Sequence, residues 1–185
     1  MLLCLVISVP LYLAALLFGL WRMDAAERAG SLDAHDSDLA GPLLLMFGYL
    51  CACVLGIVAH ELVHGTMMRA AGGRPRYGVR VVQGVYPIIY AHCDETVLRI
   101  QALTITLAPT ITALLAAYLV FVIPPVWALW LSAAVATSLA GSVGDWWMAI
   151  CLLGEPPQAF IQDHPTEVGY RLVQPVADPP SDQGY

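Results

Sequence analysis

The sequence predicts an all-α membrane protein with four transmembrane helices and a short β-hairpin in the loop between the second and third helices. Of its 185 residues, 59% are hydrophobic and only 12% are charged, which is too apolar for a soluble domain of this size. Four separate apolar stretches each reach the roughly 20 residues that a spanning helix needs. A soluble core could bury one such stretch, but four would leave too little polar surface to face water.

The first stretch begins without a basic segment, and Leu20-Trp21-Arg22 is a poor cleavage site, so we expect a retained helix and not a signal peptide. Pro109 falls inside the third stretch and is expected to kink it, which membranes tolerate. Pro124-Pro125 forms a short turn before the fourth. The four-helix transmembrane domain is expected to cover residues 1–154, with spans at about 3–21, 42–66, 102–122 and 126–153.

Residues 155–185 are expected to form a cytoplasmic tail that is partly disordered. The segment is rich in Pro, Asp and Gln, and its last dozen residues have the composition of a disordered segment. Within it, Asp163-His164-Pro165 is expected to be a turn.

The loop between the second and third spans predicts structure of its own. Gly72-Gly73-Arg74-Pro75 is expected to end the second helix. Residues 77–82 and 85–91 are rich in β-branched and aromatic residues and are separated by Gln83-Gly84, a pattern that favours a hairpin. Its edge could hold an extended peptide by strand addition, or the hairpin could lie on the membrane surface as an amphipathic lid. His92 follows it and could assist at a catalytic site, although a solvated loop histidine is the favoured interpretation.

Charge predicts the orientation in the membrane. The loop between the second and third spans carries five of the eight arginines against only Asp94 and Glu95, so the positive-inside rule places it in the cytoplasm. With four spans, both termini are then cytoplasmic as well. A net charge of −6 and the absence of basic runs argue against a nucleic-acid partner.

The second span ends in His60-Glu61-Leu62-Val63-His64, an H-E-x-x-H pattern. Residues four apart lie on one face of a helix, so His60 and His64 can bind one metal ion. Glu61 is offset by one position and can act on a metal-bound water as a catalytic base. Three ionisable residues in five are costly within apolar sequence, which favours a metal site over polar residues at a helix end.

Asp145 is the expected third metal ligand. It lies within the fourth span, and the predicted topology places it at the depth of His60 and His64 to within a turn or two. Catalytic zinc commonly has three protein ligands and one open position for water. The small residues of Gly141-Ser142-Val143-Gly144 would allow the helices to approach closely. Alternatively, Asp145 pairs with an arginine or lines a water-filled pocket.

Several residues in order resemble a known family: His60 to Gly65, Tyr90-Ala91-His92, Ala108-Pro109, Gly144-Asp145 and Asp163-His164-Pro165. The chain resembles small polytopic membrane proteins of bacteria and archaea described as putative zincin peptidases, which are in turn similar to site-2 proteases. The resemblance covers most of the chain from the second span onward. It implies a Zn²⁺-dependent peptidase of the prokaryotic cell membrane, with the lipid bilayer and a membrane-protein or peptide substrate as partners.

The resemblance implies that His60, His64 and Asp145 bind zinc and that Glu61 is the base. The sequence departs from the site-2 protease pattern because the usual asparagine near the aspartate is missing. Stabilising the oxyanion would then fall to a side chain of this chain's own, for which the candidates are Thr137, Ser138, Ser142 and His92.

Other classes fit the sequence less well. A di-iron hydroxylase needs more than the five histidines present, and a metal transporter would favour polar residues along a pathway. The main alternative is a non-catalytic metal-binding membrane protein with a structural or regulatory role. Glu61 argues against it, because a structural site has no use for a base.

Overall fold

Four α-helices dominate the structure, a computed structural model that describes residues 2–28, 40–82, 86–164 and 169–173. The predicted number of helices is confirmed, and each helix extends beyond its predicted span. The helices are α1 (Leu2–Arg28), α2 (Ala40–Ala70), α3 (Arg99–Val122) and α4 (Pro125–Leu153).

Three helical segments are long and apolar enough to cross a membrane, judged by length and composition: Leu43–Ala70, Arg99–Val122 and Pro125–Leu153. Large apolar side chains such as Leu44, Leu115 and Trp147 lie exposed on these helices. Such a surface is unfavourable in water and compatible with lipid. The first predicted span lies within α1, where several side chains are outside the described part of the chain, so that span stays a prediction.

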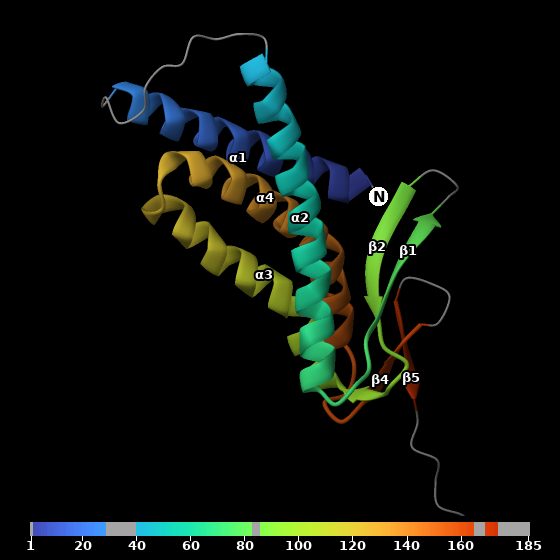
Figure 1. Cartoon of the computed structure of the whole chain (residues 1–185). Coiled ribbons are helices and arrows are strands. Elements are labelled where there is room, and N and C mark those ends of the chain that lie inside the picture. The colour runs from blue at the N-terminus through green and yellow to red at the C-terminus, as the bar shows by residue number, and fades with distance from the viewer. Residues whose placement is uncertain (1, 29–39, 83–85, 165–168, 174–185) are drawn as a thin grey trace, which may run out of the picture.

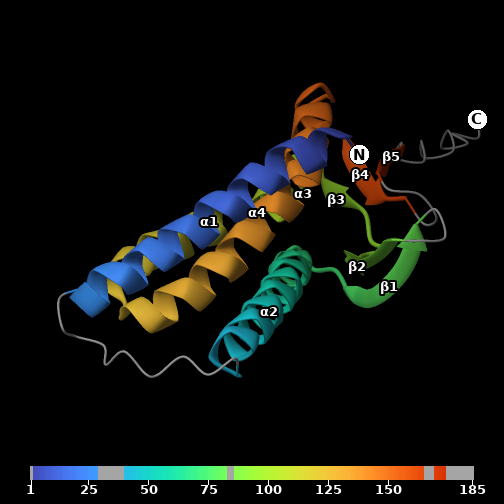
Figure 2. The ribbon, with the colours of Figure 1, turned by 90° about the horizontal axis from the view of Figure 1, so that it is seen from above.

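Helix α4 lies among the other helices and packs against α1, α2 and α3 (Figure 1). Viewed from above, α1 and α4 run side by side (Figure 2). Small residues allow this packing: a Cβ added at Gly56 of α2 would lie 2.5 Å from the carbonyl oxygen of Ala134 in α4. The guanidinium of Arg22 donates to the Phe121 and Ile123 carbonyls, each at 2.8 Å, and so ties α1 to the end of α3.

The predicted hairpin is confirmed. Strands β1 (Arg76–Val82) and β2 (Tyr86–His92) pair antiparallel, with Tyr77 opposite Ala91. The predicted turn residues Gln83 and Gly84 lie outside the described residues. Helix α2 ends as expected, because Gly72 has a φ of 92°, a left-handed conformation that glycine adopts without strain.

A second sheet, which the sequence did not predict, takes two of its three strands from the predicted tail. Strands β3 (Val97–Leu98), β4 (Phe160–Asp163) and β5 (Tyr170–Val173) pair in the order β3-β4-β5. Of the expected turn at Asp163-His164-Pro165, Asp163 is the last residue of β4 and Pro165 lies outside the described residues, so the turn stays a prediction. Residues 174–185, which the prediction of disorder concerned, also lie outside them.

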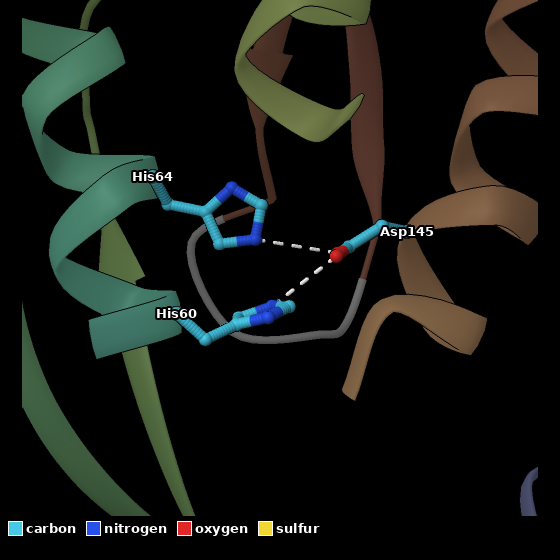
Figure 3. A group of neighbouring side chains, drawn as sticks. All are labelled: His60, His64 and Asp145. Carbon is cyan, nitrogen blue, oxygen red and sulfur yellow. Dashed lines mark ion pairs between the residues drawn. The ribbon is translucent and has the colours of Figure 1, made fainter. Parts of the chain in front are cut away.

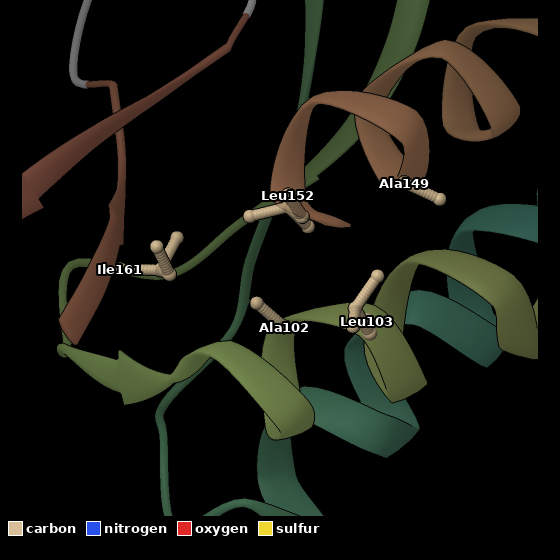
Figure 4. Close-up of a cluster of buried hydrophobic side chains, with 5 residues drawn as sticks. All are labelled: Ala102, Leu103, Ala149, Leu152 and Ile161. Atoms are coloured by element: carbon tan, nitrogen blue, oxygen red, sulfur yellow. The ribbon is translucent and has the colours of Figure 1, made fainter. Parts of the chain in front are cut away.

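Apolar packing holds this sheet to the helices. Ile161 of β4 is buried against the start of α3 and the end of α4, in a cluster with Ala102, Leu103, Ala149 and Leu152 (Figure 4). Phe160 and Ile161 favour a strand and Asp163 does not, so burial of Ile161 helps to fix this short strand against the helices. Both sheets lie at the end of the helical domain where α2 and α4 finish (Figures 1 and 2).

Candidate metal centre

Three side chains from two helices converge inside the protein. His60 and His64 lie one turn apart on α2, and Asp145 faces them from α4 (Figure 3). The Nε2 atom of His60 is 3.2 Å from Oδ2 of Asp145, and that of His64 is 3.4 Å from Oδ1. One ligand atom from each residue lies within 4.8 Å of the others, so the group could hold a metal ion.

The centre is buried below the ends of its helices. The side chains of His60, His64 and Asp145 are only 7%, 12% and 18% exposed. At 1.5 Å per residue, His60 lies about 15 Å before the end of α2 and Asp145 about 12 Å before the end of α4. The two helices therefore present their polar groups at matching depths.

Backbone carbonyls set the orientation of both imidazoles. His60 Nδ1 is 3.1 Å from the Ser138 carbonyl of α4, and His64 Nδ1 is 3.0 Å from the Ile105 carbonyl of α3. A carbonyl oxygen can only accept, so each Nδ1 carries the hydrogen and donates it. In the neutral rings, each Nε2 then has a lone pair, and both lone pairs point at the Asp145 carboxylate.

This arrangement fits a divalent cation. Two lone pairs facing a carboxylate at 3.2 and 3.4 Å repel it unless positive charge lies between them. Protonating both rings would instead place two imidazolium charges beside one carboxylate in an apolar interior, which is costly. Asp145 Oδ2 is also buried without a hydrogen-bond partner among the described residues. Two neutral imidazoles and a carboxylate, each set by a second interaction, are a ligand set that zinc commonly takes.

Glu61 lies beside this group, on the same turn of α2 as His60, and is tied to the first hairpin. Its Oε2 accepts a hydrogen bond from the backbone N–H of Ala91 at 2.8 Å. That bond shows that the edge of β2 facing away from β1 meets α2 at the centre. The hairpin thus orients the expected base. This contact involves a backbone atom, so no pattern of side chains in the sequence could predict it.

His92 is not the solvated loop histidine that the sequence favoured. It ends β2 and is only 19% exposed, with Nε2 3.0 Å from Asp94 Oδ1 and Nδ1 3.5 Å from Asp163 Oδ2. Burial raises the pKa of the Asp163 carboxyl, while the Cys93 N–H and the charge of His92 oppose that rise. Both ring nitrogens of His92 therefore face carboxylates, and the residue joins β2 to β4.

The other side chains that were expected to stabilise an oxyanion lie on α4 and already form hydrogen bonds there. Thr137 donates to the Ala133 carbonyl at 2.8 Å, and Ser142 donates to the Ser138 carbonyl at 3.1 Å. Ser138 Oγ lies 3.3 Å from Nδ1 of His60, on the side of the ring away from Asp145. These hydroxyls support the helix and the ligand and do not point to a substrate-binding role.

A family model with the description "Putative zincin peptidase" matches residues 53–160, more than half of the chain and a stretch that includes His60, Glu61, His64 and Asp145. No curated protein and no solved structure matches the chain.

Proposed function

Because this chain belongs to the family described as "Putative zincin peptidase", we propose that it is a zinc-dependent membrane peptidase that hydrolyses transmembrane or juxtamembrane peptide bonds. The observation that carries the proposal is the convergence of His60, His64 and Asp145 with their acceptor atoms facing one another. A carboxylate that could act as a base, Glu61, adjoins the ligands. Three long apolar helices support a location in the membrane.

The proposed chemistry is hydrolysis by an activated water. When bound to His60, His64 and Asp145, Zn²⁺ would polarise a water and lower its pKa towards neutrality. Glu61 takes the proton of the attacking water and passes it to the leaving amine. The N–H of Ala91 fixes one carboxylate oxygen of Glu61 and so limits the positions that the base can adopt.

The proposed substrate binds as an extended strand. The edge of β2 that faces away from β1 lies at Glu61. A peptide that paired with this edge would bring a backbone carbonyl towards the metal centre. A helical substrate must unwind first, because a helix already uses its carbonyls in hydrogen bonds. A neighbouring cavity of about 60 Å³, lined by apolar side chains such as Met68 and Ile105 and also by Glu95 and Asp163, offers room for a substrate side chain.

The arrangement of two histidines on one helix and an aspartate on a later one is similar to that of site-2 proteases. The arginine-rich loop supports an orientation with both termini in the cytoplasm, so that water would reach the centre from that side.

The test uses the full-length protein purified in detergent, with a fluorescently labelled transmembrane peptide library as substrate. Glu61→Gln should retain about one zinc per chain and slow cleavage by about 10²-fold or more, because the ligands remain and the base is lost. Glu27→Gln, the same chemical change at an exposed position of α1, is the matched control and should alter neither quantity. Unchanged cleavage by Glu61→Gln would show that Glu61 is not the base.

A non-catalytic metal-binding protein is the second candidate. The engaged hydroxyls of Thr137 and Ser142 favour it, because neither donates towards the metal centre. Stoichiometric zinc in the wild-type protein without cleavage of any library peptide would support this candidate over the peptidase.

A further inference from the structure

Pro109 lies inside α3 and is fully buried. Proline has no backbone N–H, so the carbonyl four residues earlier, that of Ile105, lacks the donor that an ordinary helix supplies. The proline ring also crowds that carbonyl and turns it away from the helix axis. A buried carbonyl left without a partner costs free energy, so another donor must satisfy it.

That donor is the metal-site histidine. Nδ1 of His64 lies 3.0 Å from the Ile105 carbonyl oxygen, close to an ideal hydrogen-bond length. The bond fixes the tautomer of His64 with the hydrogen on Nδ1, and it turns Nε2 towards Asp145.

The other histidine is oriented differently. The Ser138 carbonyl that accepts from His60 also accepts from the Ser142 hydroxyl at 3.1 Å, and α4 carries no proline after its first turn. Hydroxyl back-bonding of this kind opens a helix slightly and exposes the carbonyl. Each imidazole is thus held by a backbone carbonyl. A proline makes one of these carbonyls accessible, and a serine hydroxyl makes the other accessible.

We propose that Pro109 is a positioning residue of the metal centre: it frees the Ile105 carbonyl so that this carbonyl can orient His64 for metal binding. The inference rests on the metal site of the proposed function but not on peptidase activity. A residue with an N–H at position 109 would restore the intrahelical hydrogen bond to Ile105. His64 would then share its acceptor and lose part of its orientation.

Replacing this buried proline should favour the helix and yet weaken metal binding. Alanine or valine at 109 improves the intrinsic helix propensity of α3. Metal affinity should nevertheless fall by about 10–100-fold, the range found when a supporting hydrogen bond to a metal ligand is lost.

The experiment compares Pro109→Ala and Pro109→Val with Pro10→Ala in the full-length protein in detergent. Pro109→Val keeps most of the buried volume, so it separates loss of packing from gain of the N–H donor. Pro10→Ala is the matched control, because Pro10 also lies inside a helix, α1, and that helix carries none of the three candidate ligands. Affinity for Zn²⁺ is measured by competition with a chelator, and the visible absorption of bound Co²⁺ reports the ligand geometry.

Both Pro109 variants should bind Zn²⁺ about tenfold or more weakly and show an altered Co²⁺ spectrum, while Pro10→Ala binds as the wild type does. Wild-type affinity in Pro109→Val would overturn the inference. Metal binding by the wild type without peptide cleavage would overturn the proposed peptidase and leave the role of Pro109 standing. A wild-type protein that binds neither ion would overturn both.

Discussion

At the scale of single residues, the metal centre depends on acceptors that face one another. Asp145 is the one anionic side chain among the three, and its two oxygens face different imidazoles. Because it is the ligand that carries a negative charge, we expect its charge to contribute more to the affinity for a cation than the shape of its side chain does.

Asp145→Asn keeps the shape of the side chain and removes its charge. We expect Zn²⁺ affinity to fall by more than the about 10–100-fold that loss of a supporting hydrogen bond costs. Asp24→Asn, at an exposed ion pair with Arg28 in α1, should leave the affinity unchanged. Equal zinc affinity in the Asp145 variant and the wild type would show that this carboxylate is not a ligand. The measurement is chelator competition on the purified protein.

Tyr170 offers a residue-scale test of the unpredicted sheet. Burial, and then the hydrogen bond that its hydroxyl donates to Glu155 at 3.0 Å, raise the pKa of Tyr170 to about 12. Its folded-state pKa is higher than that of the unfolded chain, so its stabilising contribution is complete below about pH 10 and is lost as the pH rises towards about 12. The wild-type minus Tyr170→Phe difference in ultraviolet absorbance should therefore show a phenol that ionises near pH 12. Ionisation near pH 10 would mean that β5 does not hold Tyr170 beside Glu155.

At the scale of elements, the approach of α2 to α4 sets the geometry of the centre. The sequence placed this approach at Gly141 to Gly144. A Cβ at Gly141 would lie 3.4 Å from the His60 ring, so α4 does lie close to α2 there, whereas a Cβ at Gly144 would meet nothing within 4 Å. The two backbones come closest to contact at Gly56 and Ala134, one turn before His60.

Gly56→Ala should force α2 away from α4, because the added Cβ meets backbone atoms that cannot rotate aside. We expect a loss of about 1–3 kcal/mol in stability, typical of overpacking, together with weaker Zn²⁺ binding. Gly144→Ala makes the same chemical change into open space and should not lower stability. Thermal unfolding in detergent without metal gives the first quantity, and chelator competition gives the second. A Gly56→Ala protein as stable as Gly144→Ala would contradict the close packing described for α2 and α4.

At the scale of the whole molecule, the metal centre links two helices that are far apart in sequence. A cation bound only by the folded protein stabilises it by mass action, by about 2.7 kcal/mol at a free metal concentration of 100 times Kd. Zn²⁺ should therefore raise the unfolding temperature of the wild type, and a chelator should reverse the rise. The His64→Ala variant should lose most of this shift. An equal shift in both proteins would place the stabilising metal at another site.

The helices and the candidate metal ligands were predictable because their signals are local and strong. Long apolar stretches predict helices by length alone, and the four-residue spacing of His60 and His64 places both on one face of whichever helix they occupy. Asp145 was predictable because an acid in an apolar stretch is costly unless it has a partner. The hairpin of β1 and β2 followed from its β-branched residues and the intervening glycine.

The second sheet and the supporting contacts depend on tertiary packing. Strand β4 is only four residues long, and it is held in place because Ile161 is buried between α3 and α4, a contact between residues remote in sequence. The bond from Ala91 to Glu61 and the bond from His64 to Ile105 use backbone atoms, which every residue has and which no side-chain pattern can single out. The sequence by itself therefore determined which residues could bind a metal. Only the tertiary structure decided how they are held, because orientation comes from carbonyls and N–H groups that folding brings to them.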